Sequence, residues 1–210
     1  MDLSYFIFLS SGLFLGWSLG ANDAANVFGT AVGTKMVRFR TAAVISSFFL
    51  ILGAVYSGGG TTETLTRLGN VNALPGAFMV ALSAAVSVYW MIKGGLPVST
   101  SQAIVGAIIG WNFYSGRPTD LSIVSKIVST WVICPVLAGI LATLIYFLVR
   151  SLIKYSKIHL IRQDLYTRIG LIVAGAFGAY ALGANNIANV MGVFVDSCLL
   201  YTSPSPRDIS

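Results

Sequence analysis

The chain has few ionisable residues for its length. Of its 210 residues, 13 are Lys or Arg, 7 are Asp or Glu and one is His. Hydrophobic residues make up 56% of the sequence, which excludes an intrinsically disordered protein and is typical of an integral membrane protein. The predicted fold class is an all-α membrane protein, a bundle of several membrane-spanning helices.

The residue types that build enzyme and metal centres are also scarce. Cys134 and Cys198 lack the spacing of a metal site or a disulfide framework, and His159 stands alone in a basic segment. No nucleophile–base pair or metal triad is recognisable, so we expect neither an enzyme nor a resident cofactor. The basic residues behind the net charge of +6 lie in short segments between apolar runs. We interpret them as topology signals and expect no nucleic-acid partner.

A twelve-residue phrase occurs twice, each time inside a long apolar stretch. The first phrase, residues 18–29, reads SLGANDAANVFG, and the second phrase, residues 181–192, reads ALGANNIANVMG. Eight of the twelve positions are identical. Polar, glycine-interrupted segments at matching positions of two halves indicate the binding site of a transporter with an inverted repeat. We therefore predict discontinuous helices, the first interrupted near Gly20 or Asn22.

The first phrase offers one carboxylate and two amides. Asn22 and Asn26 are four residues apart and Asp23 and Asn26 are three apart, so a helix can bring all three to one face. A charged residue at the centre of a membrane helix costs about 2.5–3.5 kcal/mol, which makes a functional role the default interpretation of Asp23. Hard cations bind such oxygen ligands. The alternative is that the asparagines and glycines are packing positions between helices.

A second polar segment, PVSTSQAIVGA at residues 97–107, has the pattern of a helix start. Ser99 precedes Gln102 by three residues, which is the spacing of a capping box. The first turn of a helix offers free N–H groups and the positive end of the dipole to an anion. Further donors come from the side chains of Ser99, Thr100, Ser101 and Gln102. The segment has no Lys or Arg, so neutral donors and bound cations would hold the anion; a plain helix cap is the alternative.

The apolar runs predict five membrane segments, at residues 3–32, 41–57, 74–92, 121–149 and 169–195. We expect a polar loop at 58–72, a kink at Pro135, and a run at Gly94–Trp111 that either crosses or re-enters the membrane. Basic clusters at residues 35–40 and 150–168 both belong in the cytoplasm by the positive-inside rule. This requires an even number of crossings between them, which the sequence leaves open. The N-terminus has no basic n-region, so we expect a retained first helix.

The two phrases and the proline–serine–threonine segment together resemble the inorganic phosphate transporter family, over residues 3 to about 196. Its members carry a Gly-Ala-Asn-Asp-x-Ala-Asn signature in each half and a Pro-x-Ser-Thr-Thr-His-like helix opening. The resemblance implies phosphate symport coupled to Na⁺ or H⁺ in the plasma membrane, with sulfate or another oxyanion as an alternative cargo. It implies phosphate ligands at Ser99, Thr100, Ser101 and Gln102, and cation ligands at Asn22, Asp23, Asn26, Asn185, Asn186 and Asn189.

Three features depart from the family pattern. Asn186 stands where the second signature has an aspartate, and Gln102 stands where the helix opening has a histidine. A second proline–serine–threonine segment is absent from the 210 residues. The resemblance thus predicts a first repeat at 1–168, the first helix of a second repeat at 169–196 and a non-native disordered tail at 197–210. A transport-inactive membrane fragment is a further alternative, and the oligomeric state, a homo-oligomer included, is left open.

Overall fold

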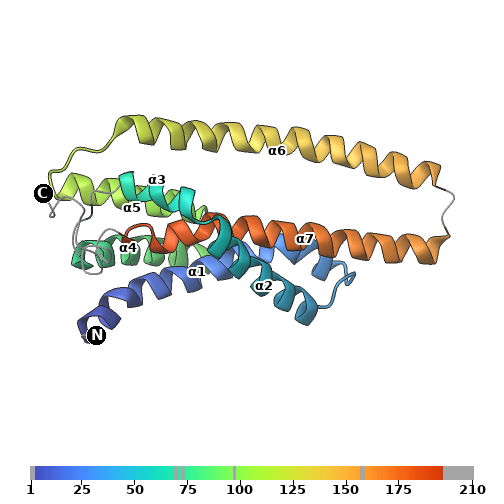
Figure 1. Cartoon of the computed structure of the whole chain (residues 1–210), viewed down its shortest axis with the longest axis horizontal. Helices are drawn as coiled ribbons and strands as arrows, with labels where there is room; N and C mark the ends of the chain where they lie inside the picture. Colours follow the sequence, from blue (N-terminus) through green and yellow to red (C-terminus); the bar gives the residue numbers. More distant parts are fainter. Residues whose placement is uncertain (1–2, 69–70, 72–73, 97, 157–158, 196–210) are drawn as a thin grey trace, which may run out of the picture.

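The computed structural model describes all residues except 1–2, 69–70, 72–73, 97, 157–158 and 196–210 (Figure 1). The described residues form helices and no strand, which confirms the all-α class. The helices are α1 (Leu3–Gly33), α2 (Phe39–Ser57), α3 (Gly59–Leu68), α4 (Leu74–Lys93), α5 (Thr100–Tyr114), α6 (Leu121–Tyr155) and α7 (Leu160–Met191).

The core lies where α1, α3, α4, α5 and the end of α7 meet. One face of α4 carries alanines at helical spacing, each at most 1% exposed, at positions 77, 81, 84 and 85. Small side chains allow helices to approach closely, and such packing joins helices in a membrane. Leu15 of α1, Ile104 and Ile108 of α5, and Phe194 belong to the same cluster. This cluster fixes α5 relative to α1, which positions the site described below.

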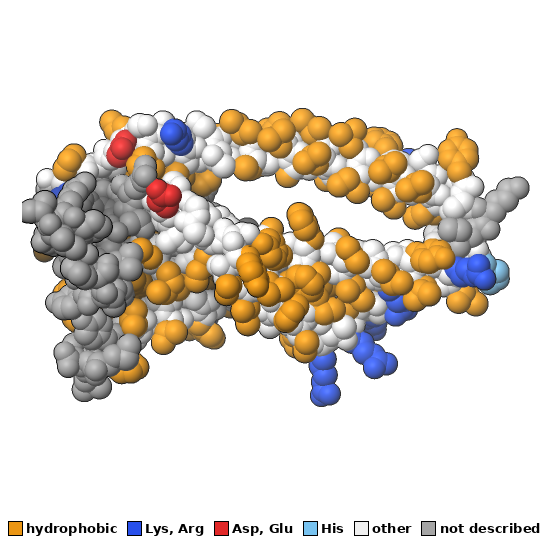
Figure 2. Space-filling model, viewed as in Figure 1, with side chains coloured by type: hydrophobic (Ala, Val, Ile, Leu, Met, Phe, Trp, Pro, Cys, Tyr) orange, Lys and Arg blue, Asp and Glu red, His pale blue; other side chains and the backbone are white. Residues whose placement is uncertain are grey.

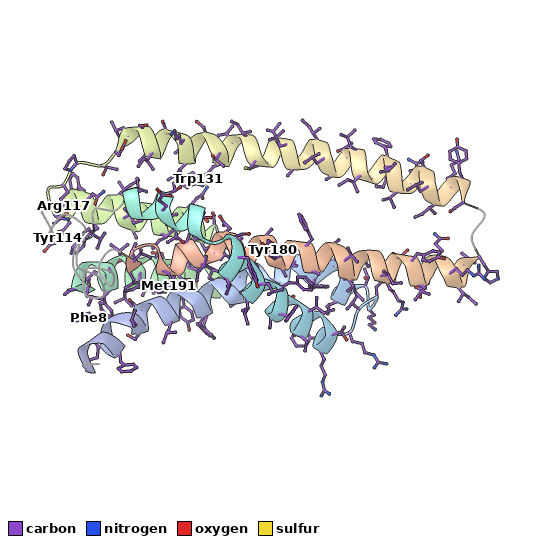
Figure 3. All side chains as sticks on the ribbon, in the orientation of Figure 1. Phe8, Tyr114, Arg117, Trp131, Tyr180 and Met191 are labelled. Atoms are coloured by element: carbon purple, nitrogen blue, oxygen red, sulfur yellow. The ribbon has the colours of Figure 1, made fainter. Side chains whose placement is uncertain are left out.

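Helices α2 and α7 cross at two glycines. A Cβ atom on Gly53 would collide with the carbonyl oxygen of Tyr180, and one on Gly183 would collide with that of Leu50. Only glycine permits this approach of two backbones. The hydroxyls of Ser57 and Tyr180 share a hydrogen bond of 2.5 Å beside the crossing, where Figure 3 labels Tyr180. Because Gly183 belongs to the second phrase, the crossing holds that phrase against α2.

Both phrases lie in continuous helices, so the predicted interruption near Gly20 or Asn22 is wrong. Helix α1 continues to Gly33 and α7 continues to Met191. A glycine inside a helix costs about 1 kcal/mol relative to alanine, which weakens the helix without ending it. Four polar side chains of the phrases, those of Asn22, Asp23, Asn186 and Asn189, find partners outside their own helix, so the backbone does not need to open to satisfy them.

Three other predicted elements need correction. The expected polar loop at 58–72 contains α3, whose Leu65 and Leu68 are buried in the core. Helix α6 contains Pro135, as predicted, and ends at Tyr155, beyond the predicted end at residue 149. Helix α7 begins at Leu160, earlier than the predicted start at residue 169, because its first turns are largely polar and give no apolar signal. The predicted repeat boundary at residue 168 therefore falls inside α7, and the predicted tail at 197–210 lies outside the described residues.

The two basic segments lie at the same end of the molecule. Arg168 Nη1 of α7 donates to the carbonyl oxygen of Met36 in the α1–α2 turn at 3.2 Å, and Figure 2 shows Lys and Arg side chains gathered there.

Helices α4 and α5 run antiparallel (Figure 1) and return the chain to the end where α4 begins. The 15 residues of α5 measure about 22 Å, short of a membrane core of about 30 Å, which favours re-entry over a crossing. Re-entry of α5 alone would leave three crossings, α2, α4 and α6, between the basic segments. The even number that the positive-inside rule requires is reached only if α4 and α5 together enter and leave the membrane on one side.

Four of the described helices are long and apolar enough to cross a membrane, namely α2, α4, α6 and α7. The most apolar is α6, which has 35 residues and none of them buried. Side chains in its first turns, ending at Trp131, touch the core, and every residue from Val132 to Tyr155 is exposed. Figure 2 shows hydrophobic side chains along its whole length. The protein is therefore an all-α integral membrane protein.

Candidate functional site

Asp23 lies at the centre of a polar network that joins α1, α5 and α7. Its Oδ2 accepts hydrogen bonds from Thr100 Oγ1 at 3.2 Å and from Asn186 Nδ2 at 3.0 Å. Its Oδ1 accepts from Asn22 Nδ2 at 2.7 Å. Hydrogen bonds to an ionised acceptor are stronger than those between neutral groups. One carboxylate thus connects the first phrase, the second phrase and the start of α5.

The second phrase extends the network with two buried amides. Asn189 Nδ2 donates to Asn186 Oδ1 at 3.1 Å and to Ser101 Oγ at 3.0 Å. Asn186 is 6% exposed and Asn189 is 2% exposed. Buried amides need such partners, because an unsatisfied polar group costs about 1–3 kcal/mol. The second phrase therefore reaches α5 through Ser101, while the first phrase reaches it through Thr100.

The start of α5 is the third part of the site. Ser99 caps the helix and its Oγ accepts from the backbone N–H of Gln102 at 3.4 Å, which confirms the predicted helix start. Asn22 Nδ2 also donates to the carbonyl oxygen of Val98 at 2.8 Å, which ties the residue before the cap to α1. Thr100 is 3% exposed. The first turn of α5, with its free N–H groups, thus points its buried hydroxyl at Asp23.

The structure brings together six of the ten predicted site residues: Asn22, Asp23, Thr100, Ser101, Asn186 and Asn189. The side chains of Ser99 and Gln102 are exposed and contact each other through the cap alone. Asn26 is exposed, one turn further along α1, and its amide donates to the carbonyl oxygen of Asn22 in the same helix. Asn185 is exposed and makes a long contact of 3.5 Å to Asn186. Asn26 therefore stays outside the network, although it follows Asn22 by four residues in the same helix.

Two contacts beside the network were not predicted from the sequence. The carbonyl oxygen of Val98 is a backbone acceptor and has no sequence signal. Thr61 Oγ1 of α3 donates to the carbonyl oxygen of Ala184 in the second phrase at 3.3 Å, in a segment predicted as a loop. The pairing of Asp23 with Asn186 did have a signal, since these residues occupy the same position of the repeated phrase.

The donor set of the network suits a weakly held cation. Its oxygens come from one carboxylate, from asparagine amides and from two hydroxyls, and such oxygens bind hard cations. The described residues contain no group of three or more His, Cys, Asp and Glu side chains that could hold a metal ion. A single carboxylate among neutral oxygens fits a monovalent cation better than a divalent one, because a divalent ion would leave more charge uncompensated.

The fold and the network define a multi-span helical membrane protein with a polar site between two helices of repeated sequence. The sequence profile of the phosphate transporter family matches residues 19–208. The chain belongs to this family, which is a family of transporters and not of enzymes. The match includes most of the segment 197–210, so it gives no support to the prediction of a non-native tail.

Individual relatives agree with the family match. A candidate phosphate permease of Mycobacterium tuberculosis is 32% identical over 166 residues, which is 70% of this chain and 30% of the relative. One from Methanocaldococcus jannaschii is 27% identical over 203 residues, 96% of this chain and 63% of the relative. A sodium-dependent phosphate transporter of Plasmodium falciparum is 30% identical over 163 residues, 71% of this chain and 24% of the relative. The chain thus spans less than two thirds of the length of these relatives.

A solved structure has the same fold. It is described as the sodium-dependent phosphate transporter, and it matches with a TM-score of 0.75 and 21% sequence identity over 98% of this chain and 70% of that chain. The likeness confirms the all-α membrane fold predicted from the apolar runs.

Proposed function

We propose that the chain forms part of a transporter that moves inorganic phosphate across the plasma membrane together with a cation. The observation that carries the proposal is the hydrogen bond from Thr100 Oγ1 to Asp23 Oδ2 at 3.2 Å. It links the first turn of α5, where an anion would bind, to the carboxylate that would face a cation. The family and the names of the relatives support phosphate as the cargo.

Shared hydrogen bonds give a physical route to coupling. A cation beside Asp23 competes with Thr100 for the carboxylate oxygen and frees the Thr100 hydroxyl to donate to an anion. Bound cations also compensate the charge of the cargo, since one negative charge entering a negative-inside cell costs about 2.3 kcal/mol per 100 mV. The name of the Plasmodium relative supports Na⁺ as the coupling ion, and H⁺ is the alternative.

The site also favours phosphate over sulfate. Phosphate near neutral pH keeps a proton and can donate a hydrogen bond, whereas sulfate can only accept. Asp23 is an acceptor beside the proposed anion site, and an ionised carboxylate only accepts. A sulfate ion there would face the carboxylate without a hydrogen bond, so the protonated oxyanion is preferred.

Equilibrium binding of labelled phosphate to the purified chain in detergent tests the proposal. Thr100→Val removes the hydroxyl and keeps the shape, and we expect about a tenfold loss of phosphate affinity, or about 1.4 kcal/mol. Thr100→Ser restores the donor and should recover most of the affinity. Thr130→Val is the matched control, because Thr130 is an exposed residue of α6 that bonds only to its own helix. Full affinity in Thr100→Val, or displacement of phosphate by equal concentrations of sulfate, would contradict the proposal.

A further inference from the structure

The contact between Asp23 and Asn186 pairs equivalent positions of the two phrases. Asn186 Nδ2 donates to Asp23 Oδ2 at 3.0 Å. The orientation of the Asn186 amide is determined by a second bond, because its Oδ1 accepts from Asn189 at 3.1 Å. The amide therefore presents its N–H group, with its partial positive charge, to the carboxylate. Asn186 is 6% exposed and Asp23 is half-buried, so the contact is partly shielded from water.

Two carboxylates at these positions would behave differently. Like charges about 3 Å apart in a buried site cannot both remain ionised without a cation or a shared proton between them. A donor amide at one of the positions removes the repulsion and supplies a partner to the remaining carboxylate. Asn186 thus does locally what a bound monovalent cation would do.

We propose that the Asn186 amide takes the place of a monovalent cation beside Asp23. The protein then binds one coupling cation fewer at this point than an equivalent network with a carboxylate in both phrases. Its polar network is stable without that cation, and Asn186 is the residue that determines the cation requirement. The inference rests on the proposed function only in treating Asp23 as the group that faces the cation.

Substitution Asn186→Asp provides the test, with thermal unfolding of the purified chain in detergent as the readout. The melting temperature is measured against Na⁺ concentration, with choline replacing Na⁺ at constant ionic strength and at a pH well above the range in which free carboxyl groups titrate. We expect a small Na⁺-specific response in the wild type. In Asn186→Asp we expect a large response, with a midpoint at a Na⁺ concentration about tenfold lower, because two facing carboxylates attract a cation more strongly than one.

Two further variants separate this effect from a general gain of charge. Asn185→Asp adds the same charge one residue away, on an exposed side chain, and should shift the Na⁺ midpoint less than about twofold. The double variant Asp23→Asn with Asn186→Asp exchanges the two groups and keeps one carboxylate and one amide in contact. It should respond to Na⁺ as the wild type does.

The results that overturn the proposal are distinct from failure of phosphate transport. Equal Na⁺ responses in Asn186→Asp and Asn185→Asp would show that added charge alone matters. No Na⁺ response in Asn186→Asp, or unfolding that Na⁺ does not reverse, would show that no cation position lies between the two side chains. A strong Na⁺ response in the double variant would show that the response does not depend on two facing carboxylates, which also contradicts the proposal. None of these measurements involves phosphate, so they hold or fail independently of the cargo.

Discussion

The two phrases agree at eight of twelve positions, yet their surroundings differ at nearly every polar or glycine position. Gly183 lies against the backbone of α2, whereas nothing lies within 4 Å of a Cβ placed on its counterpart Gly20. Asn189 is 2% exposed and bonds to two side chains, whereas its counterpart Asn26 is exposed. The first phrase supplies the charge of the site, and the second phrase supplies buried donors and a close helix contact.

This difference shows that two copies of a repeated sequence can have different structural roles. The first phrase borders a groove of ≈ 570 Å³ between α1 and α2, lined by small residues that include Gly20, Ala21, Ala25 and Gly29. The second phrase has its corresponding face closed by α2. Substitutions at equivalent positions test this difference between the two phrases, because the same chemical change is made in two environments.

The largest difference is expected at the paired glycines. Gly183→Ala places a Cβ against the carbonyl oxygen of Leu50, and we expect a loss of about 3 kcal/mol in the free energy of unfolding, at the upper end of overpacking costs. Gly20→Ala should instead gain about 0.5–1 kcal/mol from helix propensity. Unfolding of both variants in mixed detergent measures the two effects. Equal stabilities would show that α2 and α7 do not approach as closely as described.

The paired asparagines should give the next largest difference. Asn189→Ala leaves Ser101 Oγ and Asn186 Oδ1 without their buried donor, which costs about 1–2 kcal/mol in the free energy of unfolding. Asn26→Ala removes an exposed amide bonded to its own helix, and its effect should stay within about 0.5 kcal/mol. The same unfolding assay applies. A larger loss for Asn26→Ala would place the first phrase, not the second, at the packed side of the site.

The paired aromatic residues test the surroundings of the α2–α7 crossing. Tyr180→Phe removes the hydroxyl that bonds to Ser57, and we expect a loss of about 1 kcal/mol in the free energy of unfolding. Its counterpart Trp17 is 61% exposed and stacks on Phe14, so Trp17→Phe should cost less. Ser57→Ala should match Tyr180→Phe, and the double variant should cost no more than either single one if the bond is what is lost.

The smallest effect is expected where the helix of the second phrase touches the α1–α2 turn. Arg168 pairs with Asp164 at 2.7 Å, and both side chains are nearly half exposed. Solvent and salt screen such a pair, so Arg168→Gln should cost less than about 0.5 kcal/mol in the free energy of unfolding at low salt. The loss should vanish at high salt. An effect that persists in salt would mean that the bond to Met36, and not the charge, holds this end together.

The start of α5, and the need of Asp23 for polar partners, could be predicted from the sequence, because the first depends on neighbouring residues and the second on the cost of a charge in an apolar helix. Ser99 and Gln102 define a cap by their spacing, and a carboxylate in an apolar helix has a cost that demands a partner. These two features need no knowledge of how the helices pack. The contact of Asp23 with Asn186 was not predicted, although the two residues occupy equal positions in the phrases, because it depends on how α1 and α7 pack.

The continuous helices and the different fates of the asparagines could not be predicted, because they depend on packing. From the sequence, Gly183 could either interrupt a helix or allow two helices to approach closely. In the structure it allows close approach to the backbone of Leu50, and α7 continues through it. Asn26 and Asn189 have the same neighbours in sequence, and only the positions of α2 and α5 distinguish them. Helix α3 was missed because its polar residues mask two buried leucines.

The exposed surface of α6 from Val132 to Tyr155 has a consequence for biogenesis. The most apolar 18-residue stretch of α6 has a mean hydropathy of 2.6. Lipid alone can cover this surface, so α6 can insert into the membrane as soon as it leaves the ribosome. Helix α1 is synthesised earlier but carries Asp23, which gains Thr100 and Asn186 as partners only when α5 and α7 have also been made. The polar network therefore forms late in synthesis, and α6 anchors the nascent chain in the bilayer while the network is still incomplete.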